Sequence, residues 1–335
     1  MYSLIRKLLF RLEPEKAHSL TLKLLRLAYK LNLLKHTTKQ YSPREVMGLL
    51  FENPVGLAAG LDKNGDYIEA LGALGFGFIE IGTVTPKPQE GNLLPRLFRL
   101  PEQQAIINRM GFNNKGLDYV ATRLRESRYS GVLGVNIGKN RDTPLENAHE
   151  DYLLGFRRVA HFASYVTINI SSPNTSGLRD LQQADLLKVL LQTLKQEQAL
   201  FAELSKKYVP LVVKIAPDLA SDDINLIADV FLEQKIDGVI ATNTTISREG
   251  VESSAFASEA GGLSGKPLAQ LATNTIAQLN AVLKNQIPII GCGGIFSEKD
   301  ARDKLAAGAS LIQIYTSLIY EGPGLIGKLV EACRD

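Results

Sequence analysis

Polar side chains that could bind a small molecule lie after the short apolar runs of the sequence and in the long segments between them. Six of them are asparagines: Asn108, Asn113, Asn136, Asn169, Asn174 and Asn243. Asparagine amides both donate and accept hydrogen bonds, so this set suits a planar heterocycle with carbonyl and N–H groups. Because asparagine is also a common turn residue, no single member of the set decides the matter.

Two lysines add positive charge to the same regions. Lys214 interrupts the apolar run Leu211–Ile215, and a buried lysine either has an anionic or polar partner or loses its proton. It could serve as a Schiff-base nucleophile, a counter-charge to an electron-rich cofactor ring, or a phosphate ligand. Lys63 directly follows Asp62, so it could either contact a ligand or form an ordinary surface salt bridge with that carboxylate.

Ser172 lies in the segment Ser171-Ser172-Pro173-Asn174, which is also typical of a helix-capping turn. No histidine is near it in this motif, and all four lie outside the strand ends: His18, His36, His149 and His161. A Ser-His-Asp hydrolase therefore has little support. Cys292 and Cys333 give neither a disulfide framework nor a metal-ligand spacing, so we expect two free thiols and no metal site.

Glycines gather in two segments that could cradle a phosphate. One contains Gly291, Gly293 and Gly294, and the other is the stretch Gly261-Gly262-Leu263-Ser264-Gly265. Glycine lets backbone N–H groups approach an anion closely. A glycine-rich segment by itself predicts only a turn. The first of these segments, however, follows the seventh of eight apolar runs along the chain, and this position favours a phosphate site.

Eight short apolar runs alternate with helical patterns from residue 54 onward. The runs are Val55–Ala58, Phe78–Ile81, Val132–Asn136, Val166–Ile170, Leu211–Ile215, Gly238–Thr242, Ile287–Gly291 and Leu311–Tyr315. The helical patterns lie near 65–74, 115–127, 146–163, 181–207, 222–234, 267–284, 298–307 and 323–333. Strands alternating with helices imply parallel βαβ units, and eight of them predict a closed (β/α)8 TIM barrel. Two connections, 83–113 and 243–266, are long enough to carry specificity at its mouth.

The first 40 residues differ from the rest in charge and pattern. They hold nine lysines or arginines and two acids, which gives +7, whereas the net charge of the whole chain is only +3. That total is too small to indicate nucleic acid binding. Leucines recur at helical spacing in 3–12 and 15–35, with Pro14 between the two stretches. Two short, basic, amphipathic helices fit a contact with a membrane surface, and an ordinary helical hairpin packed on the body fits the same pattern.

Five motifs, in order along the chain, resemble the class 2, quinone-linked dihydroorotate dehydrogenases. They are GLAAGLDK at 56–63, IEIGTVTP at 79–86, NRMGFNN at 108–114, NISSPNT at 169–175 and GGLSG at 261–265. The similarity covers nearly the whole chain, including the N-terminal helices. It implies a division into residues 1–40, which would contact the membrane and admit quinone, and residues 41–335, which would form an FMN-binding barrel.

The resemblance also implies roles for individual residues. FMN would be bound by Ala59, Gly60, Lys63, Thr83, Asn136, Asn169, Lys214, Thr242, Gly265, Gly294, Tyr315 and Thr316. The substrate would be bound by Lys63, Asn108, Arg109, Met110, Gly111, Phe112, Asn169, Asn174, Asn243 and Thr244. Ser172 would be the catalytic base, with a proton relay tied to Thr175 and Phe112. His18 and Arg99 would line a tunnel for the quinone.

The implied reaction oxidises dihydroorotate to orotate in pyrimidine biosynthesis. Ser172 would remove a proton from the carbon beside carbon 6, hydride would pass from carbon 6 to the flavin, and a quinone would take the electrons. We expect peripheral attachment to anionic lipid at the cytoplasmic face of a bacterial plasma membrane. Two alternatives remain at this point: a lysine-dependent aldolase that uses Lys214, and a non-catalytic membrane-binding barrel with a phosphate pocket.

Overall fold

The computed structural model describes residues 2–34 and 41–334. His36 and the end of the predicted helical stretch 15–35 fall outside those ranges. Eight parallel strands close into a barrel with the neighbour order β10-β12-β13-β3-β4-β7-β8-β9. Their bounds are β3 Val55–Leu57, β4 Phe78–Val84, β7 Val132–Ile137, β8 Tyr165–Asn169, β9 Leu211–Ile215, β10 Gly238–Ala241, β12 Ile289–Cys292 and β13 Ala309–Ile314. The predicted fold class and all eight predicted strands are confirmed.

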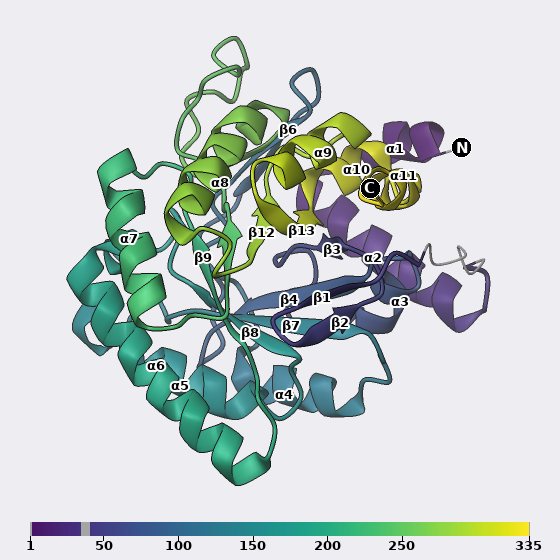
Figure 1. Ribbon diagram of the computed structural model, residues 1–335. Helices are drawn as coiled ribbons and strands as arrows, with labels where there is room; N and C mark the ends of the chain where they lie inside the picture. Colours follow the sequence, from purple (N-terminus) through teal and green to yellow (C-terminus); the bar gives the residue numbers. More distant parts are fainter. Residues whose placement is uncertain (1, 35–40, 335) are drawn as a thin grey trace.

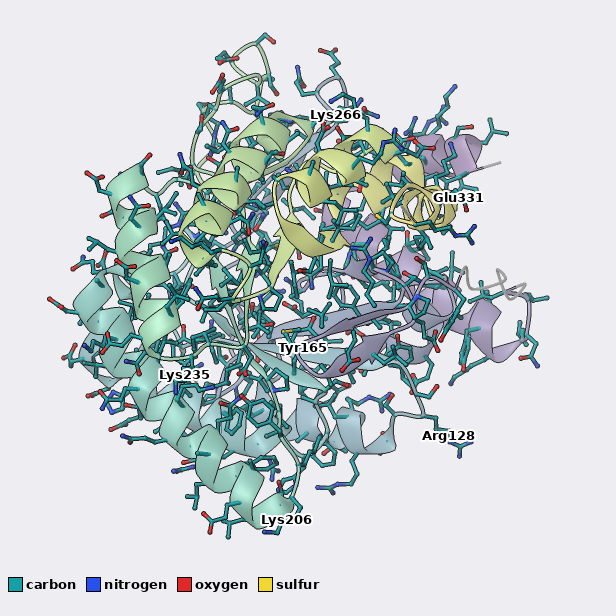
Figure 2. All side chains as sticks on the ribbon, viewed as in Figure 1. Arg128, Tyr165, Lys206, Lys235, Lys266 and Glu331 are labelled. Carbon is teal, nitrogen blue, oxygen red and sulfur yellow. The ribbon has the colours of Figure 1, made fainter. Side chains whose placement is uncertain are left out.

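Helices surround the barrel (Figure 1), and all but the short helix Thr316–Glu321 occupy positions that the sequence pattern predicts. They are α3 Ile68–Gly72, α4 Gly116–Glu126, α5 Ala148–Val159, α6 Ala184–Ser205, α7 Ser221–Glu233, α8 Ala269–Leu283, α9 Glu298–Ala306, α10 Thr316–Glu321 and α11 Gly324–Ala332. Short 3-10 turns are η1 Leu145–Asn147, η2 Leu178–Gln182 and η3 Lys266–Leu268. Figure 2 shows Lys206 and Lys235 on the outer helical layer and Tyr165 inside the barrel.

At the amino ends of the strands, the barrel interior is a packed apolar layer that a hairpin closes. The hairpin strands are β1 Arg44–Val46 and β2 Leu49–Phe51, paired antiparallel. Phe51 meets Phe78 of β4 edge to face, with ring centroids 5.0 Å apart. Tyr165, Val212 and other inward-facing side chains complete this layer. The barrel is therefore solid at this end, and any ligand site must lie toward the other end.

The two long connections form one structure at the carboxyl ends of the strands. The connection 83–113 contains β5 Leu97–Leu100 and β6 Ala105–Asn108, and the connection 243–266 contains β11 Gly262–Gly265. These strands pair antiparallel in the order β11-β6-β5. Segments about 160 residues apart in the chain thus make a small sheet beside the barrel mouth, for example through the pair Gly265 and Ala105.

The N-terminal segment forms two helices, α1 Tyr2–Leu9 and α2 Pro14–Lys30. Pro14 takes the first position of α2, where its missing N–H costs no hydrogen bond, and Glu13 accepts the N–H groups of Glu15 and Lys16. This confirms the predicted break at Pro14. Helix α2 packs against α3 and β5, and α1 lies beside α10. None of the described helices is long and apolar enough to cross a membrane.

Candidate active site at the mouth of the barrel

A cavity of about 360 Å³ opens at the carboxyl ends of the barrel strands, bordered by α2 and the β11-β6-β5 sheet. Most of the predicted site residues line it: His18, Ala59, Gly60, Lys63, Thr83, Asn108, Met110, Gly111, Phe112, Asn169, Ser172, Asn174, Lys214, Thr242, Asn243, Thr244, Gly265, Gly294, Tyr315 and Thr316. Residues from seven of the eight barrel strand ends, all but β7, thus converge on one space, as the topology requires.

Four predicted site residues do not line this cavity: Arg99, Arg109, Asn136 and Thr175. The guanidinium of Arg109 pairs with Glu259 at 2.5 Å and lies over the Phe98 ring. Arg99 instead holds the connection between α1 and α2, donating to the backbone carbonyls of Leu9 and Phe10.

Lys214 is the most enclosed cation of the cavity. Its side chain is 5% exposed, and it forms no hydrogen bond or ion pair with the described residues. A buried ammonium without a partner is costly, so the position favours a bound polar or anionic group. On the opposite side of the same strand, apolar side chains such as Val213 pack in the core between the strands and the outer helices.

Lys63 provides a second free cation. Burial lowers the pKa of Lys63 to about 8, with repulsion from Arg96 adding to the effect and Glu15 opposing it. The predicted alternative of a salt bridge with Asp62 is wrong. That carboxylate turns away and accepts the backbone N–H groups of Asp66 at 3.0 Å and Tyr67 at 2.7 Å. Lys63 is therefore available for an anionic ligand.

A chain of side-chain hydrogen bonds fixes the amides below the cavity. Asn169 donates to Thr83 at 2.9 Å and to Asn136 at 3.2 Å. Asn136 in turn donates to Glu80 at 2.8 Å, and Glu80 also accepts from Tyr165 at 2.9 Å. Asn136 thus supports the cavity floor from inside the barrel. Polar groups buried in this way hold one arrangement because each lost bond is expensive.

Ser172 stands at the rim, 6% exposed. Its hydroxyl oxygen accepts the backbone N–H of Asn174 at 3.2 Å, and its proton has no acceptor among the described residues. His149 and His161 lie on and beside outer helix α5, away from the cavity. His18 lines the cavity, but among the described residues no histidine hydrogen-bonds to the Ser172 hydroxyl, so no catalytic triad forms there. Asn174 also donates to Asn108 at 3.3 Å, which ties the serine turn to β6.

The glycine segments form a cradle at one end of the cavity. Gly294 has φ +71, and a Cβ there would lie 2.3 Å from Cα of Ala269. Gly265 has φ +105, and a Cβ there would lie 2.3 Å from the carbonyl oxygen of Gln104. The hydroxyls of Ser264 and Thr316 hydrogen-bond at 2.8 Å, which joins the segment that contains Gly265 to the start of α10. A side chain at Gly265 or Gly294 would collide with neighbouring backbone, so only glycine fits, and a glycine-rich backbone at the end of a cavity suits a bound phosphate.

Several cavity residues were not predicted from the sequence: Ser19, Leu22, Leu97, Ile106, Ser264, Leu268, Cys292, Phe296 and Gln313. Ser264 and Cys292 stand inside the glycine-rich segments, so a signal for them was present. The apolar members come from α2, β5, β6, η3 and the segment after β12. Since each looks locally like an ordinary core residue, only the tertiary structure identifies them.

Among the described residues, no group of three or more histidine, cysteine, aspartate or glutamate side chains could hold a metal ion. The fold and the site together define a (β/α)8-barrel enzyme with an anion cradle and two free lysines at its mouth. The family model "Dihydroorotate dehydrogenase" matches residues 42–334, so the chain belongs to this family.

Curated relatives named "Dihydroorotate dehydrogenase (quinone)" match over nearly the full length. The protein of Acinetobacter baylyi is 56% identical over 332 residues, covering 99% of both chains. That of Marinobacter nauticus is 56% identical over 336 residues, covering 100% of this chain and 99% of its own. Among solved structures, the enzyme from Eimeria tenella in complex with ferulenol has a TM-score of 0.89 at 41% identity, covering 96% of this chain and 90% of that chain. These matches leave the aldolase and non-catalytic alternatives without support.

Proposed function

We propose that this chain oxidises dihydroorotate to orotate with a bound flavin and passes the electrons to a quinone, in pyrimidine biosynthesis. The observation that carries the proposal is the 56% identity, over 99% of both chains, to a dihydroorotate dehydrogenase (quinone). The arrangement of the cavity agrees with it, because cradle, free lysines and serine all face one space.

The family is flavin-dependent, and the residues present suit FMN in particular. The cradle of Gly265 and Gly294 would hold its phosphate, since both glycines line one end of the cavity and a side chain at either would collide with neighbouring backbone and displace the cradle. Lys214 would supply a positive charge beside the ring. When bound, the flavin would take two electrons from the substrate and deliver them to the quinone.

The chain's own residues would orient the substrate and move its proton. Lys63 would bind the substrate carboxylate, and the amides of Asn108, Asn174 and Asn243 would bind the carbonyl and N–H edges of the pyrimidine ring. The Ser172 oxygen would accept the proton from the carbon beside carbon 6. An unassisted serine is a weak base, so the proton must move on, and we assign this relay to the buried surroundings of Thr175 and Phe112.

We assign residues 1–40 to membrane contact and quinone entry, and 41–335 to the barrel. Leu4, Leu8, Leu24 and Leu31 are each more than half exposed, next to several lysines and arginines. Helix α2 also contributes His18 and Leu22 to the cavity wall. A lipid-soluble quinone could thus enter from beneath the helices, with the chain on the cytoplasmic face of a bacterial plasma membrane as a peripheral protein.

The acceptor tests this proposal. Dihydroorotate consumption is measured with a quinone, with fumarate and with NAD, in the presence and absence of vesicles containing anionic lipid. We expect turnover with the quinone alone, and vesicles should increase it for a long-chain quinone. Turnover with fumarate or NAD in place of the quinone would contradict the proposed acceptor. A protein inactive with all three would contradict the proposed reaction.

A further inference from the structure

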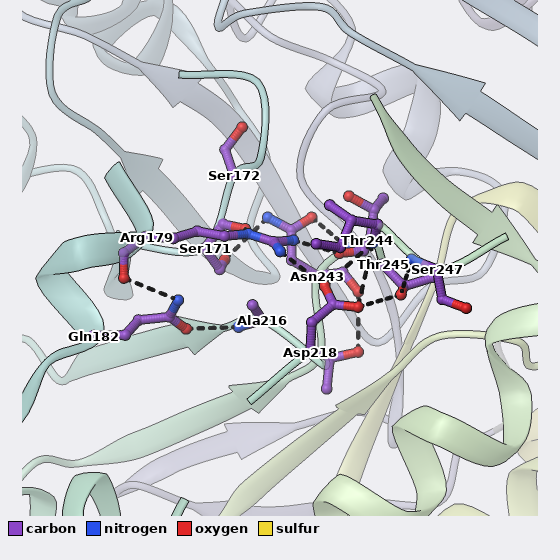
Figure 3. Close-up of polar contacts among 12 residues, drawn as sticks. Ser171, Ser172, Arg179, Gln182, Ala216, Asp218, Asn243, Thr244, Thr245 and Ser247 are labelled. Carbon is purple, nitrogen blue, oxygen red and sulfur yellow. Dashed lines mark hydrogen bonds and ion pairs between the residues drawn. The ribbon is translucent and has the colours of Figure 1, made fainter. Parts of the chain in front are cut away.

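Arg179 lies at the centre of a polar cluster behind the serine turn (Figure 3). It belongs to η2, which follows the Ser172 segment, and each nitrogen of its guanidinium has its own acceptor. Nε donates to the Ser171 carbonyl at 3.1 Å, and Nη2 donates to the Thr244 carbonyl at 2.9 Å. Nη1 donates to Oδ2 of Asp218 at 2.8 Å. One side chain therefore joins the segments that follow β8, β9 and β10.

Asp218 extends this connection on its far side. Its Oδ1 accepts the hydroxyl of Thr245, and the backbone N–H of Ile246 lies 3.2 Å from both carboxylate oxygens. The side chains of Arg179 and Asp218 are only 21% and 15% exposed. A charged pair that is mostly enclosed and fully hydrogen-bonded is held in one geometry, unlike an exposed pair.

The backbone around Arg179 is also fixed to the barrel. Gln182, in the same turn, accepts the N–H of Ala216 at 2.8 Å at the end of β9. Its amide nitrogen lies 3.4 Å from the Arg179 carbonyl. Hydrogen bonds thus hold both the backbone of this turn and the guanidinium of Arg179, so the position of the guanidinium depends on the positions of the strand ends.

The two carbonyls that Arg179 binds belong to functional segments. The Ser171 carbonyl is part of the peptide bond that carries Ser172. Thr244 follows Asn243, whose amide nitrogen donates to the Ser171 hydroxyl at 3.0 Å. Figure 3 shows the Ser172 hydroxyl pointing away from this cluster. The cluster therefore sets where the serine and the Asn243–Thr244 segment stand, without occupying the substrate space.

We propose that Arg179, held by Asp218, is a positioning residue that fixes the distance between the catalytic serine and the substrate-binding segment after β10. The proposal rests on the proposed function. A planar guanidinium can meet three acceptors in fixed directions, whereas a lysine ammonium on a flexible stem cannot reproduce that fork. Misplacement of a reacting group by about 1 Å can lower a rate on the order of 100-fold.

The first variant to measure is Arg179→Met in the full-length holoenzyme. Anaerobic reduction of bound FMN by saturating dihydroorotate should slow about 100-fold. The FMN content should stay at the wild-type level, because the phosphate cradle is formed by the end of β11 and the segment after β12, neither of which Arg179 contacts. The Kd for orotate, read from the flavin spectrum, should rise less than about tenfold. Loss confined to orotate binding, with normal reduction at saturation, would overturn the positioning role.

Two further variants keep the test independent of folding. Arg179→Lys retains the charge but not the fork, so reduction should stay well below the wild-type rate; a wild-type rate would show that charge alone suffices and would overturn the proposal. Asp218→Asn retains the arginine and should slow reduction about tenfold, a smaller loss because the carbonyl contacts remain. Unchanged reduction in Asp218→Asn would overturn the role given to the pair.

Arg157→Met is the matched control, since it removes an outer arginine paired with Glu197 at 2.5 Å on the helix surface. It should leave reduction and orotate binding unchanged. If dihydroorotate does not reduce the wild-type flavin, the proposed function fails, and this inference fails with it. If the wild type is reduced normally and Arg179→Met is reduced at the same rate, only the inference fails.

Discussion

The strands of the barrel bury their apolar side chains, whereas the two N-terminal helices leave theirs exposed. Every residue of β8 and β9 is buried. Helix α1 has no buried residue, and α2 has only Ala17 and Leu22. Burial stabilises a fold by roughly 25 cal/mol per Å² of apolar surface. The apolar side chains of the barrel strands therefore stabilise the fold, whereas the exposed leucines of the helices contribute little to its stability.

Polar contacts add to the small apolar contact that Ala17 and Leu22 of α2 make with the barrel. The hydroxyl of Tyr2 donates to the Ile319 carbonyl at 2.7 Å, and Glu15 pairs with Arg96 at 2.7 Å. These contacts fix the helices to the barrel while leaving the leucines free. A contiguous exposed apolar face rimmed by charge is typical of a surface that meets a membrane or another protein. This difference supports the proposal that the barrel carries the chemistry and that the helices provide access for the quinone.

The largest effect should come from Ser172→Ala, at the barrel mouth. Loss of a general base lowers rates roughly 10²–10⁴-fold, so reduction of the flavin by dihydroorotate should fall by that order, with FMN still bound. Rapid-mixing absorbance measures it. Vesicle binding should be unchanged, because Ser172 is buried and its substitution alters neither the charge nor the exposed leucines of α1 and α2. A normal reduction rate would remove Ser172 from the role of base.

The next effect should come from Gly294→Ala in the cradle. The new Cβ would collide with the backbone of Ala269 at a φ of +71, and such strain costs on the order of 1–3 kcal/mol. FMN should bind about tenfold more weakly or worse, as measured by the FMN-to-protein ratio after dialysis. Gly324→Ala, where a Cβ would meet nothing within 4 Å, is the control. Equal FMN retention in both variants would argue against the cradle.

A smaller, selective effect should come from Leu24→Glu combined with Leu27→Glu. These side chains are 53% and 52% exposed, so the fold should tolerate the change. Vesicle binding and turnover with a long-chain quinone should fall about tenfold, since charge opposes insertion of the apolar face. Flavin reduction should not change. Leu204→Glu on α6 is the control, because Leu204 is 75% exposed, and it should change none of these measurements. An equal loss of vesicle binding and quinone turnover in this variant would refute a specific role for α2.

The smallest effect concerns pH and His18, which joins the two regions. Burial lowers the pKa of His18 to about 4, with repulsion from Lys63 adding to it and Glu15 opposing it. The unfolded chain takes up this proton near pH 6.5, so the free energy of unfolding should fall as the pH drops from about 6.5 toward 4.

His18→Gln should therefore lose less Tm than the wild type between pH 7 and pH 4.5, as measured by thermal unfolding. Burial also raises the pKa of Asp62 to about 6, against the backbone N–H groups that lower it, which works in the opposite direction. That contribution is present in both proteins and cancels in the comparison. Identical pH dependence in the two proteins would contradict a buried neutral histidine.

The barrel could be predicted from sequence because its signals are local. Runs such as Leu211–Ile215 have the length and composition of buried strands, and helices follow each of them. Site residues at strand ends, including Lys214 and Ser172, could be placed for the same reason: closing the barrel brings all strand ends together.

Other features depend on contacts between distant segments and left no local signal. Nothing in the long connections indicates that β11 would pair with β6 to make a sheet beside the mouth. Arg109 stands in a motif of the family, yet its guanidinium turns to Glu259 on the other long connection. Arg179 stands in a polar turn with no local sign of a role, and its three acceptors lie up to 65 positions away along the chain.

The most direct test of the account is the visible spectrum of the purified protein before and after anaerobic addition of dihydroorotate. The account predicts a yellow protein that bleaches with dihydroorotate and regains its colour with a quinone but not with fumarate or NAD. A yellow protein that dihydroorotate does not bleach would contradict the substrate. A colourless protein that cannot be reconstituted with FMN would contradict the cofactor and, with it, the assignment of the cavity.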